Sequence, residues 1–252
     1  MSDILVHTEA GVMTLTFNRV QRKNSITSAM YAALADALTQ AQDDAAVRCV
    51  LIQGDATIFS AGNDIGDFLN APPAAGKDAP PSPEFRFLHG IAAFPKPIVA
   101  AVCGPAVGIG TTLLLHCDLV YAGDNSAFSV PFVNLGLVPE AASSLLMPRT
   151  IGHQRAFAML VMGRTVDADH AREAGFVNEV VAPGQTEAEA RKVVRDICAL
   201  PTEAVAISRR LLKLPPEDMT RRIDQEAHLF AERLRSTEAV AAFKSFMARR
   251  KG

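Results

Sequence analysis

The sequence predicts an α/β fold that continues into a region made of helices alone. Short apolar runs typical of buried strands alternate with helical segments through the first two thirds of the 252 residues. From residue 140 onward the segments have helical spacing, apart from one short strand candidate at residues 176–181. A strand, a helix and a second strand in succession form a parallel crossover unit, so we expect a largely parallel sheet.

The N-terminal part of the chain predicts a hairpin, a helix and a buried strand. "ILVHT" and "GVMTLTF" are typical of two strands joined by a tight turn at residues 9–11. Residues 27–42 open with a hydroxyl side chain suited to capping a helix, and Met30, Leu34 and Leu38 follow at helical spacing. The apolar run "CVLIQG" then predicts a strand.

The middle of the chain repeats this alternation after a proline-rich stretch. "NAPPAAGKDAPPSP" (residues 70–83) is typical of a surface loop, and a helix is predicted over residues 84–94. "PIVAAVCG" and "DLVYAG" predict two further strands, with a helix at residues 109–116 between them. His116 and Asp118, where that helix enters a strand, are expected to pack or to cap.

The last third predicts four amphipathic helices, "EAEARKVVRDICAL", "PTEAVAISRRLLKL", "DMTRRIDQEAHLFAERL" and "STEAVAAFKSFMARR". One core cannot easily bury so many apolar faces, so we expect subunit contacts there. We therefore divide the chain into a core domain, residues 1–182, and a C-terminal helical oligomerisation region, residues 183–252.

Composition excludes several classes of function. A net charge of -2 is unlike the basic excess of a nucleic-acid surface, and no apolar run reaches the length of a membrane span. The four cysteines lie far apart without metal-ligand spacing, which is typical of reduced core residues. The N-terminus lacks the features of a secretion signal. We expect a cytoplasmic protein with no metal, nucleic-acid or membrane partner.

Two glycine turns follow buried strands and could direct backbone N–H groups at one point. They are "FSAGNDI" (residues 59–65) and "GPAVGIG" (residues 104–110), the second at the start of a predicted helix, where unpaired N–H groups can hold an anion. Taken singly, each glycine can equally serve a sharp reversal or close packing. Neither turn is a dinucleotide fingerprint or a P-loop, which excludes nucleotide hydride transfer and kinase chemistry.

Glu140 is the only charged residue in "SAFSVPFVNLGLVPEAASS" (residues 126–144). It could complement a helix dipole after Pro139. It could instead be a base held among Leu137, Val138, Ala141 and Ala142, since apolar neighbours raise the proton affinity of a carboxylate. Ser143, Ser144 and His153 invite a hydrolase interpretation, but the nucleophile-elbow motif of such enzymes is missing.

These motifs together resemble the crotonase family, the enoyl-CoA hydratase/isomerase superfamily. The resemblance runs from "VMTLTFNRVQRKNSI" through "FSAGND", "FPKPIVAAVCGPAVGIGTTLLLHCDLVYA" and "AFSVPFVNLGLVPEAASS" to "GRTVDADHAREAGFVNEVV", in the family's order. It implies a spiral of ββα units with a C-terminal α-helical trimerisation region, and hence a homotrimer or a dimer of trimers. It also implies an acyl-CoA thioester as substrate, so that coenzyme A enters with the substrate and no separate cofactor is needed.

The resemblance also implies the site residues. The thioester oxygen would be held by the backbone N–H groups of Asn63 and Ile109, which form an oxyanion hole. Lys23 and Ser25 would lie near the coenzyme A phosphate and adenine, and Asp64 would brace the first turn. The remaining positions assigned to the thioester site line the two turns: Ala61, Gly62, Ile65 and Gly108.

The family divides at its catalytic carboxylates, and this sequence resembles the isomerases. Hydratases of the family use two glutamates at positions that here hold Thr112 and Phe132. "NLGLVPEAASS" is similar to the segment that carries the single base of the Δ3,Δ2-enoyl-CoA isomerases, which assigns that role to Glu140. The alternatives are another crotonase reaction, or a non-catalytic CoA-binding or RNA-associated scaffold, against which the near-neutral charge and Glu140 both weigh.

Overall fold

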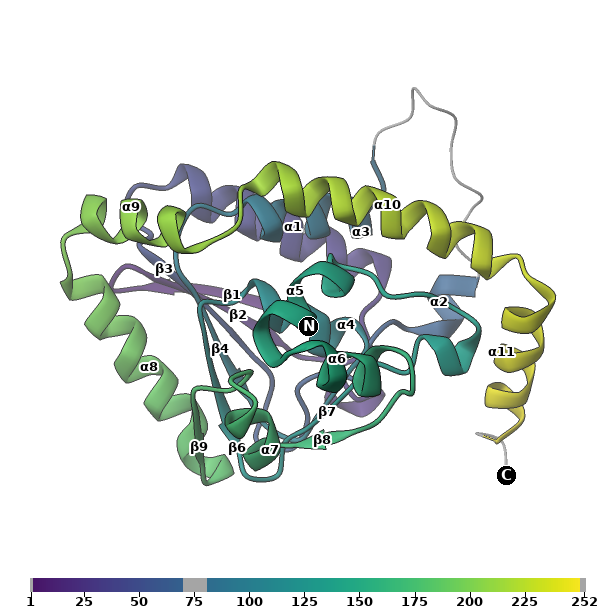
Figure 1. Cartoon of the computed structure of the whole chain (residues 1–252). Coiled ribbons are helices and arrows are strands. Elements are labelled where there is room, and N and C mark those ends of the chain that lie inside the picture. The colour runs from purple at the N-terminus through teal and green to yellow at the C-terminus, as the bar shows by residue number, and fades with distance from the viewer. Residues whose placement is uncertain (1, 70–80, 250–252) are drawn as a thin grey trace.

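A computed structural model describes residues 2–69 and 81–249 and confirms the α/β class. The main sheet has the strand order β1-β2-β3-β4-β6-β9 (Figure 1). Strands β1 (Ile4–Glu9) and β2 (Val12–Phe17) form the predicted antiparallel hairpin. Strands β3 (Cys49–Gln53), β4 (Ile98–Val102), β6 (Leu119–Gly123) and β9 (Glu179–Val181) continue the sheet in parallel, as the alternation of strands and helices predicted.

A second, smaller sheet of very short strands was not predicted. It consists of β5 (Pro105–Val107), β7 (Ala127–Ser129) and β8 (Val166–Asp167), in the order β5-β7-β8. Strands β5 and β7 pair in parallel, while β7 and β8 pair antiparallel. Strands of two or three residues are too short to show a period in the sequence. Because β5 leads directly into α4 (Ile109–Thr112), this small sheet positions the second glycine turn.

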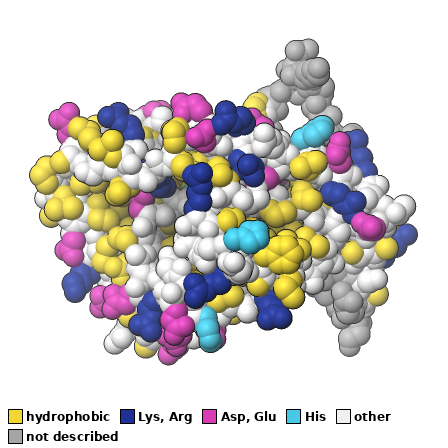
Figure 2. Space-filling model, viewed as in Figure 1, with side chains coloured by type: hydrophobic (Ala, Val, Ile, Leu, Met, Phe, Trp, Pro, Cys, Tyr) yellow, Lys and Arg dark blue, Asp and Glu magenta, His cyan; other side chains and the backbone are white. Residues whose placement is uncertain are grey.

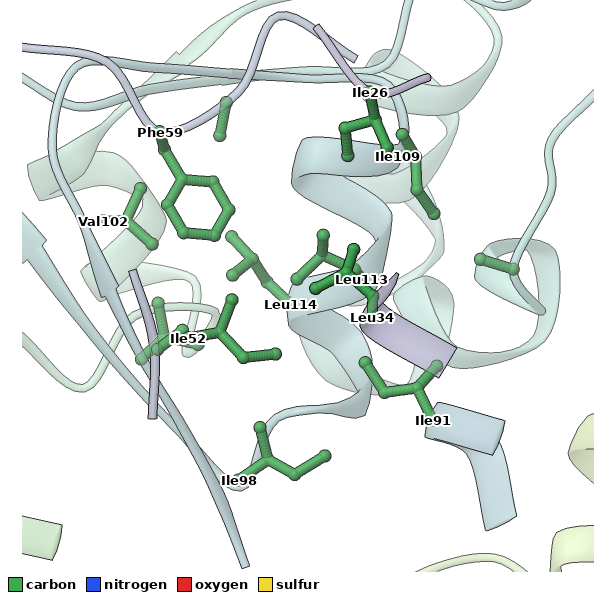
Figure 3. Close-up of a cluster of buried hydrophobic side chains, with 14 of the residues drawn as sticks. Ile26, Leu34, Ile52, Phe59, Ile91, Ile98, Val102, Ile109, Leu113 and Leu114 are labelled. Atoms are coloured by element: carbon green, nitrogen blue, oxygen red, sulfur yellow. The ribbon is translucent and has the colours of Figure 1, made fainter. Parts of the chain in front are cut away.

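The two faces of the main sheet bury different residues, because successive side chains of a strand point to opposite sides. Cys49 and Leu51 of β3 pack with α8 (Pro183–Ala199), whereas Val50 and Ile52 face the main core. Figure 3 shows part of that core, where Ile52, Ile98 and Val102 of the sheet lie with side chains of neighbouring helices. The predicted linker stretch at residues 70–83 lies mostly outside the described residues.

Helices α1 (Ser28–Asp43) and α3 (Pro83–Ala93) pack against each other and contribute Leu34 and Ile91 to the main core. The Thr27 hydroxyl accepts a hydrogen bond from the Met30 N–H at 3.3 Å, which confirms the predicted helix cap. The predicted helix at residues 109–116 divides into α4 and the 3-10 helix η2 (Leu113–His116). Three short elements complete this half of the fold: η1 (Val20–Arg22), α2 (Ile65–Leu69) and η3 (Val133–Leu135).

Beyond Glu140, the chain is mostly helical as predicted, with the expected strand at β9 and the additional short strand β8, which was not predicted. Helices α5 (Ser143–Ile151), α6 (His153–Leu160) and α7 (Ala168–Glu173) precede β9. The four predicted C-terminal helices are α8, α9 (Thr202–Leu212), α10 (Pro216–Leu234) and α11 (Thr237–Arg249). Figure 1 shows α10 as a long helix that extends across α1 and α3 toward α11. None of the helices in the described ranges is long and apolar enough to cross a membrane.

The C-terminal helices are joined to the core by buried polar contacts as well as by apolar packing. Arg209 of α9 donates to the Asp118 carboxylate at 2.8 Å and to the Phe94 carbonyl at 2.6 Å. Lys213, which follows α9, donates to the His116 carbonyl at 2.5 Å. Asp118 also accepts from the Ile98 N–H at 2.8 Å, so the predicted packing or capping role of this residue is confirmed.

Candidate active site

The two predicted glycine turns lie side by side, and a parallel pairing between Ser60 and Ala106 sets their register. The Ser60 N–H donates to the Pro105 carbonyl at 3.1 Å, and the Val107 N–H donates to the Ser60 carbonyl at 2.9 Å. Three residues beyond this pair, the two segments reach Asn63 and Ile109. The pairing therefore brings both predicted donor residues to the same end of the paired segments.

Glycine is needed where the two turns touch. Gly62 and Gly108, which immediately precede the predicted donors, have φ values of +84° and +56°, a region that L side chains rarely adopt. A Cβ on Gly62 would lie 2.7 Å from the Val107 carbonyl oxygen, and one on Gly110 would lie 2.9 Å from the Ser60 carbonyl oxygen. Both distances are shorter than a van der Waals contact, so larger residues would push the turns apart.

The local backbone pairing leaves the N–H groups of Asn63 and Ile109 without an acceptor among the described residues, although Ile109 itself is buried. Ile26 and Asn63 form a parallel bridge. In this bridge the Ile26 carbonyl accepts from the Asp64 N–H at 2.9 Å, and the Ile26 N–H donates to the Gly62 carbonyl at 2.8 Å. The N–H of Asn63 itself therefore faces away from Ile26. Ile109 is the first residue of α4, where an N–H has no acceptor within the helix. Within the described residues, neither N–H donates to another group of the chain.

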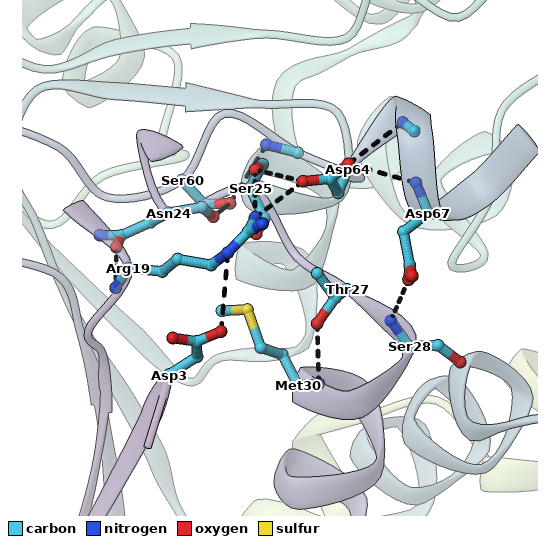
Figure 4. Close-up of polar contacts among 12 residues, drawn as sticks. Asp3, Arg19, Asn24, Ser25, Thr27, Ser28, Met30, Ser60, Asp64 and Asp67 are labelled. Atoms are coloured by element: carbon cyan, nitrogen blue, oxygen red, sulfur yellow. Dashed lines mark hydrogen bonds and ion pairs between the residues drawn. The ribbon is translucent and has the colours of Figure 1, made fainter. Parts of the chain in front are cut away.

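A polar network joins the first turn to the loop before α1 (Figure 4). Arg19 donates to the Asp64 carboxylate at 2.8 Å, to the Ser25 carbonyl at 2.9 Å and to the Ser25 hydroxyl at 2.7 Å. Burial alone would raise the pKa of Asp64, but the hydrogen bond from Arg19 and those from Asp67 and Ser25 bring it below its ordinary value. Asp64 is therefore held as a carboxylate that braces the turn.

Asn24 makes the second connection between that loop and the turn. Its buried side chain donates to the Ile58 and Phe59 carbonyls, both at 3.1 Å, and accepts from the Arg19 N–H at 2.8 Å. Sequence reasoning missed both Arg19 and Asn24, although both lie in the "FNRVQRKNSI" segment that carries the family resemblance.

The remaining residues assigned to coenzyme A lie near the first turn. The Lys23 carbonyl accepts from the Ala61 N–H at 2.9 Å, while the Lys23 side chain is exposed. Ile65 begins α2 directly after Asp64. The structure thus brings Lys23, Ser25 and the turn together, and their contacts with coenzyme A remain predictions.

Glu140 is buried, with 8% of its surface exposed. The Thr112 hydroxyl donates to the Glu140 carboxylate at 2.5 Å. Burial raises the pKa of Glu140 to about 8, the hydrogen bond from Thr112 opposes this shift, and the charge of Glu226 adds to it. A carboxyl group whose pKa lies near neutral pH can both take up and release a proton there, as general acid–base chemistry requires, whereas a solvated helix-end carboxylate remains ionised.

Glu140 and the two turns form one site through α4 and Tyr31. Thr112, the hydrogen-bond partner of Glu140, lies three residues after Ile109 in the same helix. The Tyr31 hydroxyl donates to the Asn63 side-chain oxygen at 2.5 Å. Burial raises the pKa of Tyr31 well above its usual value and the charge of Glu140 raises it further, so this phenol stays protonated beside Glu140. Sequence reasoning did not identify Tyr31.

The two positions that hold glutamates in the hydratases have other contacts here. Thr112 is the donor to Glu140, and the ring of Phe132 covers the second turn, 3.5 Å from where a Cβ on Gly108 would lie. Phe132 is itself buried. Among the described residues, no group of three or more His, Cys, Asp or Glu side chains is arranged to hold a metal ion.

Two further residues support the segment that carries Glu140. His116 Nε2 lies 2.8 Å from the Ala141 carbonyl oxygen, so the predicted packing role of this histidine is confirmed. Glu226 of α10 accepts from the Ala142 N–H at 2.6 Å and from the Ser144 N–H at 3.0 Å. Sequence reasoning missed Glu226, because nothing in the amphipathic pattern of α10 distinguishes this glutamate from the helix's exposed ones.

Comparison with known proteins places this site in a family. The family model "Enoyl-CoA hydratase/isomerase" matches residues 7–252. Enoyl-CoA delta isomerase 2 of Rattus norvegicus is 36% identical over 252 residues, covering 98% of this chain but only 64% of the rat protein, so the chain spans less than two thirds of that relative. The 1,2-epoxyphenylacetyl-CoA isomerase of Escherichia coli (strain K12) is 36% identical over 216 residues, covering 84% of this chain and 82% of that enzyme.

Solved structures of similar proteins have the same fold. An enoyl-CoA hydratase/isomerase from Pseudoalteromonas atlantica superposes with a TM-score of 0.93 at 37% identity, covering 98% of both chains. Pseudomonas aeruginosa OdaA superposes with a TM-score of 0.92 at 45% identity, covering 98% of this chain and 99% of that one. The predicted crotonase fold is thereby confirmed. The chain therefore belongs to the enoyl-CoA hydratase/isomerase family, and the paired glycine turns and the buried Glu140 lie within the matched residues.

Proposed function

We propose that the protein shifts the double bond of 3-enoyl-CoA thioesters to give 2-enoyl-CoA. The observation that carries this proposal is the buried carboxylate of Glu140, which is hydrogen-bonded to the helix whose first residue supplies one of the two N–H groups without an acceptor. The positions that hold the glutamate pair in hydratases contain Thr112 and Phe132. Glu226 does not replace that pair, because its oxygens accept hydrogen bonds from Ala142 and Ser144.

One base is sufficient for this reaction. The Glu140 carboxylate removes a proton from C2 of the 3-enoyl thioester, and the electron pair moves onto the carbonyl oxygen to give a dienolate. The N–H groups of Asn63 and Ile109 stabilise that oxygen, where losing one donor typically costs about 100- to 1,000-fold in rate. Glu140 then returns the proton to C4, which leaves the double bond between C2 and C3. No atom is gained or lost, and no second acid or water is required.

The environment of Glu140 suits this proton shuttle. A base whose pKa is about 8 binds the abstracted proton firmly enough to remove it and can still release it near neutral pH. The names of the rat delta isomerase and of the E. coli epoxyphenylacetyl-CoA isomerase support an isomerase over a hydratase. The second name makes isomerisation of an aromatic-derived CoA thioester the alternative reaction. A non-catalytic scaffold is disfavoured, since Glu140 and both turns are in place.

We place coenzyme A against the loop before α1. Lys23 is the exposed cation beside the first turn, and Ser25 is fixed by Arg19 and Asp64. Ala61, Gly62, Ile65 and Gly108 bring backbone close to the thioester. The Arg19 network supports this assignment because it fixes the loop and the first turn as one unit.

We also propose that the C-terminal helices assemble the protein as a trimer or a dimer of trimers. Figure 2 shows hydrophobic side chains gathered over α9, and Leu211 and Leu212 are 78% and 88% exposed. Leucine side chains so fully exposed next to each other are typical of a contact surface. Helix α8 packs on the main sheet, so we expect the helices after it to form the contacts between subunits.

The paired assay of 3-enoyl-CoA and 2-enoyl-CoA substrates tests the proposed reaction. With no carboxylate at Thr112 or Phe132, we expect kcat/KM for hydration of the 2-enoyl thioester to be at least about 100-fold below that for isomerisation, the loss typical of a missing acid–base partner. An absorbance assay of both reactions on one purified preparation measures the ratio. Comparable values for the two reactions would rule out the isomerase assignment.

Glu140→Gln tests the base. We expect isomerisation to fall by about 10,000-fold while affinity for a saturated acyl-CoA changes little, because the amide keeps the shape but cannot accept the proton. The pKa of Glu140 is raised from 4.5 to about 8 in the folded protein, so its protonated form stabilises folding. This contribution to the free energy of unfolding is fully present below pH 4.5 and is lost as the pH rises through 8. The variant should therefore gain melting temperature over wild type as the pH increases from 5 to 9. Glu217→Gln, an exposed change, is the control, and unchanged turnover in Glu140→Gln would refute the role.

Thr112→Val tests the hydrogen bond that opposes protonation of Glu140. Removing the hydroxyl should raise the pKa of Glu140 further, so the acidic limb of the kcat/KM profile should move to higher pH. Loss of a hydrogen bond to a charged group suggests about a tenfold lower rate at pH 7, with recovery at high pH. An acidic limb at the wild-type pH would show that Thr112 does not tune the base.

Light scattering tests the assembly. We expect the mass of three or six chains at micromolar concentration, and Leu212→Glu should shift it toward one chain because the charge would have to be buried at the contact. Leu5→Glu, a change at a leucine that is 43% exposed and lies outside the C-terminal helices, should leave the mass unaltered. A monomeric wild type would contradict the proposal.

A further inference from the structure

The segment directly after Glu140 has an unusual backbone. Ala141 and Ala142 have φ values of 59° and 55°, in the left-handed region that residues with a Cβ rarely adopt. These two alanines lie between Glu140 and the start of α5. We call them, together with the first two residues of α5, the base elbow (Ala141–Ser144). Both alanines are fully buried. The direction of the Glu140 side chain depends on this elbow, so whatever holds the elbow also aims the base.

Glu226 makes most of the polar contacts that hold the elbow. One carboxylate oxygen accepts from the Ala142 N–H at 2.6 Å. The other accepts from the Ser144 N–H at 3.0 Å and from the Ser144 hydroxyl at 2.5 Å. Glu226 is only 5% exposed. Three donors shared between two oxygens is the pattern of an ionised carboxylate, which can only accept.

On its other side, the elbow is held by His116. Burial lowers the pKa of this imidazole to about 4, so it is neutral and its Nε2–H donates to the Ala141 carbonyl at 2.8 Å. Lys213, which follows α9, in turn fixes the His116 carbonyl at 2.5 Å. The elbow is therefore held by His116 of η2 and by two residues about 70 to 85 positions further along the chain. These are Glu226, which bonds to the elbow directly, and Lys213, which bonds to His116.

We propose that Glu226 is a positioning residue for the catalytic base: it fixes the base elbow so that Glu140 stays against Thr112, and it places a second negative charge beside Glu140. This inference rests on the proposed isomerase function.

The effect of the Glu226 charge on the pKa of Glu140 can be measured separately, because few other charged groups lie near Glu140. The carboxylate of Glu226 raises the pKa of Glu140. The other groups that face the base are neutral: Thr112 from α4, Tyr31 from α1 and His116 from η2. Arg222, on the same helix as Glu226, donates to the Ser144 hydroxyl at 3.1 Å and is the cation facing this cluster. Burial raises the pKa of Glu226 itself, and the hydrogen bonds from Ser144 and Ala142 oppose that change.

A simpler role for Glu226 would be to cap the N-terminus of α5, where carboxylates are favoured. Such a cap would change the stability of the protein without changing how the base titrates. The pH dependence of turnover, and the separation of kcat from KM, therefore distinguish positioning from capping.

The experiment compares Glu226→Gln, Glu226→Asp and the control Glu232→Gln, an exposed change on the same helix, with wild type in the 3-enoyl-CoA assay. Glutamine keeps the shape but loses the charge and one acceptor. We expect kcat to fall by about 10- to 100-fold with KM within about threefold, the cost of a slightly misplaced group. The acidic limb of the pH profile should move to lower pH, because Glu140 has lost its negative neighbour. Aspartate keeps the charge with a shorter reach, so kcat should fall while the limb stays near its wild-type pH.

Circular dichroism and binding of a saturated acyl-CoA establish that each variant is folded. A folded Glu226→Gln with kcat within twofold of wild type and an unmoved limb would overturn the inference. If the glutamine variant does not fold, the test rests on Glu226→Asp, and a wild-type kcat in that variant would overturn the inference. If the wild type isomerises 3-enoyl-CoA and the Glu226 variants have its kcat and pH profile, only the inference about Glu226 is contradicted. If the wild type itself has no isomerase activity, the proposed function is contradicted.

Discussion

The site depends on one constraint, the parallel pairing of Ser60 with Ala106. This pairing sets the register of the two glycine turns, and the register brings Asn63 and Ile109 to the same end of the paired segments. Contact at that end is possible only because Gly62 lies against the Val107 carbonyl, where a Cβ would lie at 2.7 Å. A slip of one residue would reverse the direction of each N–H group. The geometry of the donors is thus a property of sheet pairing and of glycine, independent of the side chains of Asn63 and Ile109.

Features that follow from local chemistry could be predicted from the sequence. The central strands β3 and β4 are almost entirely apolar, and the Thr27 cap is the usual hydroxyl before a helix. Glu140 could be singled out because it is the only charged residue in a nineteen-residue segment, and the structure shows that it is buried. The two turns could be identified because few residues other than glycine permit positive φ values. Their roles, however, came from the family resemblance and not from spacing.

The parts that could not be predicted are contacts between residues far apart in the sequence. Arg19 and Asp64 are 45 residues apart, and Ala142 and Glu226 are 84 residues apart. No periodicity relates such residues, and Arg19 and Glu226 look like ordinary surface charges in the sequence. Tyr31 and His116 are similar cases, since their apolar neighbours predict packing and say nothing about the hydrogen bonds of a phenol or an imidazole. The small β5-β7-β8 sheet was missed because its strands are too short to show alternation.

These distant contacts change how the division of the chain is understood. A boundary near residue 182 separates the sheets from the four C-terminal helices, yet Glu226, Arg209 and Lys213 all lie beyond it and all bond to residues before it. Two of these contacts lead to the segment around Glu140, one directly and one through His116. Buried charged groups are costly unless they are paired, so each of them also fixes its helix in one position. The C-terminal helices and the segment around Glu140 are therefore held in place by the same bonds, and a subunit contact formed by those helices would act on the same structure that holds Glu140.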